Sequence, residues 1–389
     1  METSRPGGLA LADAYYRDYG GRARVLSREG KRAIGYMSAV APVEIITAAG
    51  FIPVRIKGDP AEAVLKAPAM METLVCPYVL SAFDLALRGR YDYLEGMVIP
   101  HTCDSVTRTY EVWKRNFPLP YYHFLNVPHL DDKPSLEFLT RVLRTFIKSL
   151  EQAWGSTISK EGLARAVAAH NEQRQAVRGL YELRKRDKPA ISGVEIMKLL
   201  TAVKALPVEE SLSLIRQVVS EAEKRKGRVR RRPTRIMLAG DQIDDTTLVE
   251  IIENTGARVV MDDISVGSKI YFADVEETED PIDGIARYYL KKVPLPTFVR
   301  GGEVDYRTGL ELRFGYLRRF IPEFRVDGVV LLVYRYCDPY GLEVPAAVSY
   351  IESTGTPVLH LEDDYSASTP ARLKTRVEAF LEILEGRRK

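Results

Sequence analysis

Three cysteines are the residues of this 389-residue chain best suited to chemistry, and they lie far apart in the sequence. Cys76 follows a short apolar segment, Cys103 lies three residues after an apolar run that ends at Pro100, and Cys337 lies four residues after Val333. Ligands of open α/β sheets bind at the carboxyl ends of the strands, so all three positions suit a site. An odd number of widely spaced cysteines excludes a disulfide framework.

Two interpretations of the three thiols remain open on position alone. The dipeptides Cys103-Asp104 and Cys337-Asp338 each place a predicted helix cap after a cysteine, and a helix N-terminus stabilises a thiolate. Tetrahedral structural zinc takes four ligands, usually in close pairs, whereas an iron–sulfur cubane on three cysteines leaves one iron free. No compact ferredoxin spacing is present, and the alternative is that all three are small buried hydrophobes.

The elements that must position these cysteines alternate between strands and helices. In the first third, apolar runs predict strands at 33–37, 51–56 and 96–100, with helices at 43–49, 78–87 and 104–113. In the last third, the same reasoning predicts strands at 235–240, 257–261, 329–333 and 357–361, with helices at 247–254, 310–320 and 370–386. From 136 to about 223, helical patterns leave almost no strand candidates.

This pattern predicts an α/β protein with two doubly wound parallel-sheet domains of the Rossmann or flavodoxin type and a helical insertion between them. The predicted domains are 1–134, with two of the cysteines; 135–232, the helical insertion and a basic linker; and 233–389, with the third cysteine. If the two α/β domains face each other, their strand ends bring the three thiols to one cleft.

Composition excludes several classes of protein. The 56 Lys and Arg against 53 Asp and Glu give a net charge of +3, which argues against a dedicated nucleic-acid binder. The basic segment 224–233 is either a phosphate-binding patch or, as we favour, a solvated linker. No apolar run approaches the roughly 18 residues of a membrane span, and residues 1–12 lack a secretory signal. We therefore expect a cytoplasmic protein with reduced thiols and no membrane partner.

Several long segments resemble one family. They are 35–37, 42–46 and 48–55; 89–100 with Cys103-Asp104; 243–245, 256–260 and 262–263; and Cys337-Asp338-Pro339 with 374–380. Together they resemble the 2-hydroxyacyl-CoA dehydratase D-component family, which also contains the cluster-bearing subunits of ATP-dependent benzoyl-CoA reductase. The resemblance runs from about Gly35 to Glu382.

The resemblance implies a [4Fe-4S] cluster on Cys76, Cys103 and Cys337, with one iron that carries no cysteine, and so favours the metal interpretation. It also implies a homologous second subunit, in a heterodimer or a homodimer, and a separate ATP-dependent iron–sulfur activator that delivers one electron. The chain has neither G-x-x-x-x-G-K-[ST] nor G-x-G-x-x-G, which agrees with nucleotide chemistry residing elsewhere.

The function that the resemblance implies is elimination of water from a 2-hydroxyacyl-CoA thioester. One added electron turns the thioester carbonyl into a ketyl radical anion, which expels the neighbouring hydroxide and leaves a far more acidic β-hydrogen. A benzoyl-CoA reductase-type subunit, which reduces an aromatic ring by one-electron steps, is the close alternative. An electron-relay or scaffolding iron–sulfur subunit is the second.

Two residues are candidates for catalysis. Ser38, just after the first strand, could hydrogen-bond substrate or the ligand of the open iron, or could be an ordinary helix cap. Glu44 could accept a proton, or could be a first-turn acid favoured by the helix dipole, which we favour.

Further polar residues near strand ends have weaker claims. His101 precedes Cys103 by two residues and could support a cysteine ligand. Asp241, Asp244 and Asp245 resemble a metal or acid–base cluster, although a turn and cap after a strand is the simpler interpretation. Arg335, beside Cys337, could bind the phosphate-bearing tail of a thioester or tune the cluster.

Overall fold

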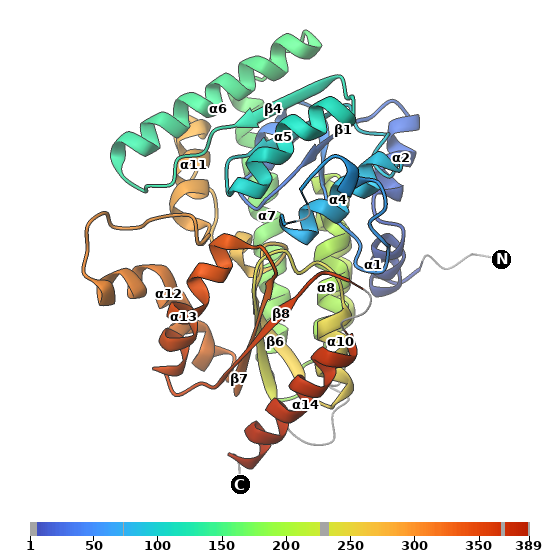
Figure 1. The fold of residues 1–389 in the computed structure, drawn as a ribbon. Helices are drawn as coiled ribbons and strands as arrows, with labels where there is room; N and C mark the ends of the chain where they lie inside the picture. The colour runs from blue at the N-terminus through green and yellow to red at the C-terminus, as the bar shows by residue number, and fades with distance from the viewer. Residues whose placement is uncertain (1–5, 73, 226–232, 367–369, 388–389) are drawn as a thin grey trace, which may run out of the picture.

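The computed structural model describes residues 6–72, 74–225, 233–366 and 370–387. Two four-stranded parallel sheets lie one above the other, each covered by helices (Figure 1). Most of the predicted basic linker, residues 226–232, lies outside the described residues.

The N-terminal sheet has the strand order β2-β1-β3-β4. Its strands are β1 (Arg32–Tyr36), β2 (Phe51–Arg55), β3 (Gly96–Pro100) and β4 (Tyr121–Leu125), and its helices are α1 (Gly8–Arg17), α2 (Gly21–Arg28), α3 (Val43–Ala48), α4 (Pro77–Leu87) and α5 (Asp104–Asn116), with the short η1 (Ala67–Ala69). The three predicted strands are confirmed, and β2 and β3 are buried along their whole length. The edge strand β4 was not predicted, because its middle residues are only half-buried and no continuous apolar run marks it.

The C-terminal sheet repeats this topology in the order β6-β5-β7-β8. Its strands are β5 (Arg235–Ala239), β6 (Arg258–Asp263), β7 (Gly328–Tyr334) and β8 (Val358–Asp363). Around them lie α10 (Thr247–Asn254), η3 (Ser268–Ile270), α11 (Pro281–Arg287), η4 (Tyr288–Lys292), α12 (Tyr306–Glu323), α13 (Asp338–Glu352) and α14 (Pro370–Gly386). All four predicted strands are confirmed: β5 and β7 are buried along their whole length, as the central strands of a parallel sheet require, whereas the edge strand β8 is mostly half-buried.

The middle of the chain is helical, as predicted, but a separate insertion is not confirmed. It forms α6 (Lys133–Trp154), α7 (Lys160–Arg184), α8 (Gly193–Ala202), η2 (Val203–Ala205) and α9 (Val208–Glu223). Helix α6 packs on β4, and α7 contacts both α3 of the N-terminal half and β6 of the C-terminal half. Apolar residues of α7 to α9 share one core with β5, β6 and β7. These helices therefore pack against the two sheets and do not form a separate insertion.

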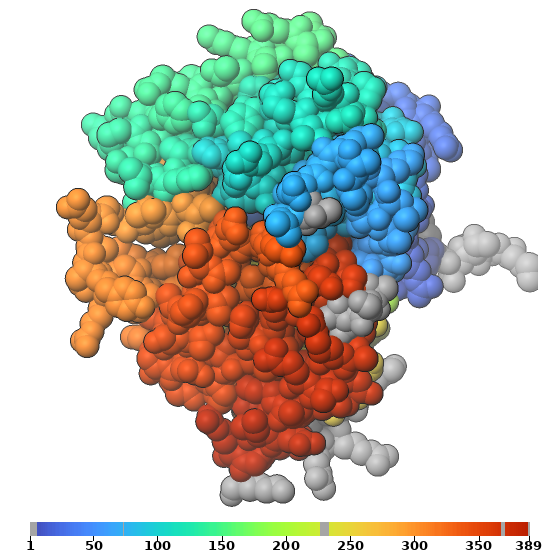
Figure 2. All heavy atoms as spheres, in the orientation of Figure 1, coloured from blue at the N-terminus to red at the C-terminus, as the bar shows by residue number. Residues whose placement is uncertain are grey.

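Packing also crosses the predicted domain limits. Helix α11 and η4, which follow β6 in sequence, bury Ile285 and Leu290 in the core of the N-terminal sheet. The two halves thus meet along a line across the face shown in Figure 2, with blue-to-green residues above and orange-to-red residues below.

Within the described residues, no helix has both the length and the apolar character needed to cross a bilayer.

Candidate functional site

One cavity opens where the two sheets point their strand ends at each other. In both parallel sheets the strand order reverses between the two central strands, which are β1 and β3 in one and β5 and β7 in the other. Ser38, Cys103, Asp241 and Cys337 follow these four strands, and all four line the cavity together with Cys76. Such reversal points are where doubly wound proteins bind ligands.

Each of the three cysteines occupies the same local position, the residue that caps a helix. Cys76 precedes α4, Cys103 precedes α5 and Cys337 precedes α13. The prediction that Asp104 caps its helix was wrong by one residue, because Asp104 is the first helical residue and Cys103 is the cap. The same holds for Asp338 and Cys337. The acids lie in the first turn, where the helix dipole favours negative charge.

This placement sets two opposing effects on the thiols. Burial raises the pKa of Cys76 to about 12 and that of Cys103 to about 11, and it raises the pKa of Cys337 well above its ordinary value. The neighbouring thiols and Asp241 add to these shifts, whereas backbone N–H groups of the first helical turns favour the thiolate. Without a cation in the cavity the thiols are therefore protonated, and a bound metal would have to displace their protons.

The donor set fits a cluster better than a single ion. Among the described residues, no group of three or more His, Cys, Asp or Glu side chains is arranged to hold one metal ion. Ligand sulfurs on one zinc ion each lie about 2.3 Å from the metal, whereas in a cubane the three thiolates bind three different irons and stand farther apart. Three thiols around one cavity, each with helix N–H groups nearby, are the kind of donors that the second arrangement uses.

Ser38 lines the same cavity in a strained backbone conformation. Its φ is +67°, and the side chain is 9% exposed. Tyr336, next to Cys337, also lines the cavity with φ of +59°. Non-glycine residues in this region are uncommon, and they gather where the surrounding structure needs a particular direction of the chain.

We expect Ser38→Gly to raise the free energy of unfolding by about 1 kcal/mol relative to Ser38→Ala, because glycine adopts positive φ without strain. Both variants lose the hydroxyl, so the pair separates the backbone from the side chain. Urea denaturation of the two variants measures the difference. Equal stabilities would show that the backbone at this position is not strained.

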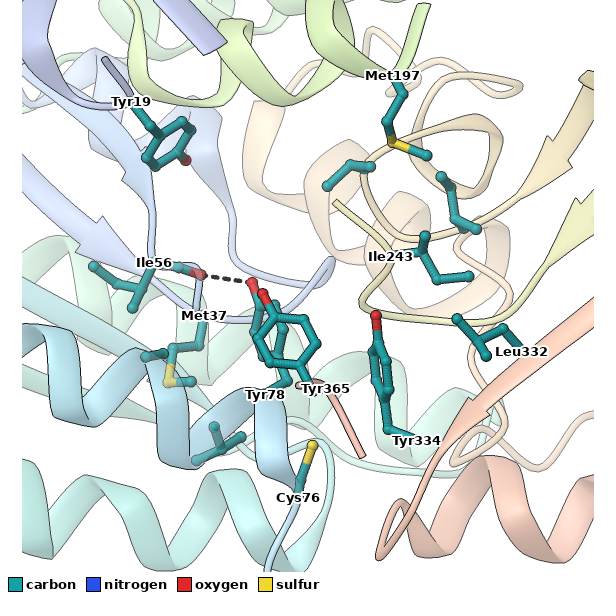
Figure 3. Packing of buried hydrophobic residues seen from close by; sticks show 14 of the residues in the cluster. Tyr19, Met37, Ile56, Cys76, Tyr78, Met197, Ile243, Leu332, Tyr334 and Tyr365 are labelled. Carbon is teal, nitrogen blue, oxygen red and sulfur yellow. Dashed lines mark hydrogen bonds between the residues drawn. The ribbon is translucent and has the colours of Figure 1, made fainter. Parts of the chain in front are cut away.

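A buried tyrosine network forms the wall of the cavity behind Cys76. The Tyr78 hydroxyl lies 3.0 Å from both the Ile56 carbonyl and Asp244 Oδ2, and its single proton can serve one of them at a time. Figure 3 shows Cys76 below the Tyr78 ring, with Tyr365 and Tyr334 beside it. The ring centroids of Tyr78 and Tyr365 are 5.5 Å apart. Burial raises the pKa of Asp244 to about 6.

Asp244 should make the stability of the protein fall between pH 4 and pH 6. Its folded pKa lies above its unfolded value, so its contribution is complete below about pH 4 and is lost as the pH rises through 6. Between pH 4 and pH 8, the free energy of unfolding of Asp244→Asn should rise by about 3 kcal/mol relative to that of the wild type. Chemical denaturation at the two pH values checks this, and a difference independent of pH would contradict it.

The loop after β5 joins the two halves of the cavity. Gln242 Nε2 donates to Asp241 Oδ2 at 2.8 Å, and Gln242 Oε1 accepts from the buried guanidinium of Arg55 at the end of β2. Asp241 also accepts from the Ser265 hydroxyl. Asp241 therefore faces the three thiols in a fixed position, while Asp245 accepts from the Thr247 amide at 2.8 Å in the turn expected from the sequence.

Glu44 lies apart from the cysteines. It is completely buried, pairs with Arg174 of α7 and accepts from the Tyr289 hydroxyl at 2.8 Å. Burial alone would raise the pKa of Glu44, but Arg174 and His170 hold it below its ordinary value. The geometry thus favours a structural role, and its role as proton acceptor stays a prediction.

The other candidates are also placed outside the cavity wall. His101 stacks near His129, with ring centroids 4.7 Å apart. Arg335 is exposed and donates to Glu362 at 2.8 Å. Neither arrangement directs the side chain at the thiols.

Sequence reasoning missed several residues of the wall. Tyr78, Tyr334 and Tyr340 line the cavity, as does the segment 295–297. Tyr78 and Tyr340 lie two and three residues after cysteines, so helix geometry offered a signal for them. Segment 295–297 follows η4, which packs on the opposite half, and nothing local in the sequence marks it.

Comparison with known proteins identifies the family of the chain. The family model described as 2-hydroxyglutaryl-CoA dehydratase, D-component, matches residues 38–384. The chain is 27% identical to a benzoyl-CoA reductase subunit of Thauera aromatica, over 87% of each chain. It is 24% identical to the (R)-phenyllactyl-CoA dehydratase beta subunit of Clostridium sporogenes and 20% identical to the beta subunit of (R)-2-hydroxyglutaryl-CoA dehydratase of Acidaminococcus fermentans, each over 92% of this chain and 93% of the relative. The matched region contains all three cysteines, and the chain belongs to the 2-hydroxyglutaryl-CoA dehydratase D-component family.

Proposed function

We propose that this chain is one subunit of a 2-hydroxyacyl-CoA dehydratase and that Cys76, Cys103 and Cys337 hold a [4Fe-4S] cluster with one iron free of cysteine. The observation that carries the proposal is the convergence on one cavity, at the reversal points of both sheets, of three cysteines that each stand at the N-cap position of a helix. The beta-subunit names of two relatives support a second, homologous subunit as partner. An ATP-dependent activator would supply the electron.

When bound, such a cluster supplies one-electron chemistry and a Lewis-acidic iron. The chain itself holds the three thiolates, and the N–H groups at the starts of α4, α5 and α13 offset part of their negative charge. The wall also contains apolar side chains, which include Val79, Val106 and Leu332 and lower the local dielectric around the thiols.

Ser38 and Asp241 are the polar groups placed to act on a bound thioester. Ser38 lines the cavity opposite the strand ends of the other sheet and can donate a hydrogen bond to a carbonyl or hydroxyl oxygen. Asp241 is held by Gln242 and Ser265 and can accept a hydrogen bond or a proton from the substrate. Asp241 thus fits the role of proton acceptor better than Glu44, which Arg174 engages.

The experiment is an anaerobic assay of the reconstituted protein with its partner subunit and activator. We expect water loss from a 2-hydroxyacyl-CoA, with Ser38→Ala lowering kcat by roughly 10- to 100-fold, as removal of a positioned hydrogen-bond donor does. Arg335→Ala, at an exposed position outside the wall, is the control and should keep its activity. Absence of dehydration by the iron-loaded complex would contradict the proposal.

Reduction of benzoyl-CoA is a second candidate, favoured by the 27% identity to the benzoyl-CoA reductase subunit. Offering benzoyl-CoA to the same complex separates the two reactions. A cluster whose spectrum ignores every thioester would favour the electron-relay alternative.

A further inference from the structure

A second cavity lies beside the first and is lined mainly by cationic side chains. We call it the basic cavity. Six Lys or Arg residues line it, against Asp131 and Asp263: Lys269, Lys291, Lys292, Arg300, Arg313 and Arg319. Since the whole chain carries a net charge of only +3, this is a strong local concentration of positive charge.

Several of these charges lack a compensating acid. Lys269 forms an ion pair within the protein, with its Nζ 2.6 Å from Asp263 Oδ2. Arg313 pairs with Glu343 at 2.8 Å, but its Nη1 is buried without a hydrogen-bond partner among the described residues. Lys291, Lys292 and Arg319 form no ion pair with any residue in the described ranges. The cavity therefore offers free cationic donors, which an anion would neutralise.

Arg300 shows that the positive charges repel one another. It donates to the carbonyls of Lys291 and Val293 at 2.7 and 2.9 Å, so its guanidinium is fixed in place. Burial lowers the pKa of Arg300, and the nearby Arg313 lowers it further. An anionic ligand would relieve both effects.

The basic cavity and the cysteine cavity share a wall. Pro294 and Arg300 line the basic cavity, whereas residues 295–297 between them line the cysteine cavity. The Lys269 ammonium also lies 5.6 Å from the centre of the Tyr340 ring, which belongs to the cysteine cavity. The two cavities therefore lie next to each other, with this loop between them.

We propose that the basic cavity binds the phosphate groups of a coenzyme A thioester whose acyl end lies in the cysteine cavity. This inference rests on the proposed function, because it takes the thioester as substrate. Arg and Lys are the residues that recognise phosphate, and the pantetheine arm of coenzyme A joins its phosphates to its thioester, so one molecule carries a group suited to each cavity.

The test is calorimetric titration of the iron-free full chain with free coenzyme A. We expect the double variant Lys292→Gln/Arg319→Gln to bind coenzyme A at least 10-fold more weakly. It should also show a smaller dependence of the Kd on salt. The matched control Arg115→Gln/Lys148→Gln removes two exposed cations from α5 and α6 and should bind like the wild type.

The outcomes separate this inference from the proposed function. No binding by the wild type, or equal weakening in the two double variants, would overturn it. Inorganic phosphate binding as tightly as coenzyme A would also overturn it, by showing a general anion site. The titration uses iron-free protein, so binding of coenzyme A would support this inference even if the cluster assignment failed. A chain that loads iron but does not bind coenzyme A would refute this inference and leave the proposed function standing.

Discussion

Cys337→Ala should lose the metal centre. The variant leaves two thiols in the cavity, and a cubane held by only two cysteines is no longer anchored from both sheets. After anaerobic reconstitution we expect about four iron atoms per wild-type chain and less than about one in the variant. Iron and acid-labile sulfide analysis measures both.

Arg335→Ala is the matched control for this experiment. Arg335 lies two residues before Cys337, is exposed and pairs with Glu362 at the surface, so the variant should keep its iron. A Cys337→Ala protein with full iron content would show that Cys337 is not an iron ligand. Loss of iron in both variants would point to misfolding of the loop instead.

Arg174→Met should destabilise the protein by about 3–5 kcal/mol, because it leaves the Glu44 carboxylate buried without its charge partner. The pair joins α3 to α7, and the side chains of Arg174 and Glu44 are 5% and 0% exposed. Chemical denaturation near pH 7 measures the loss. As a control, Arg216→Met removes the exposed pair with Glu172 and should change stability by less than about 1 kcal/mol.

The effect of pH gives this prediction a second check. The folded pKa of Glu44 lies below its ordinary value, so its stabilising contribution is complete above about pH 4.5 and is lost as the pH falls through the folded pKa. The deficit of Arg174→Met should therefore shrink in acid. A deficit below about 1 kcal/mol at neutral pH would show that the pair contributes little.

The sequence allowed the strands and the cysteine positions to be predicted because both depend on local pattern. Runs such as Gly96–Pro100 and Gly328–Tyr334 are apolar throughout, and a residue just past such a strand must lie at its carboxyl end. Parallel strand ends of facing sheets then bring Cys103 and Cys337 together. Cys76 was placed less directly, because it follows no strand and instead caps α4 in the connection between β2 and β3.

What could not be predicted depends on contacts between distant segments. The sequence places Glu44 in the first turn of a helix. Only the fold shows that Arg174, 130 residues away, pairs with it in the core. Likewise, η4 follows β6 but packs on the opposite half, which makes the wall shared by the two cavities. The predicted helical insertion was not confirmed for the same reason, because α7 packs on both halves.

A Mössbauer spectrum of the anaerobically reconstituted wild-type chain tests the central claim most directly. Three thiols on one cubane leave one iron in a different environment, so about a quarter of the iron should give a distinct signal. That signal should change when a 2-hydroxyacyl-CoA is added, whereas the signals of the other three irons should change little. Iron in a single uniform environment, or a chain that takes up no iron, would contradict the account.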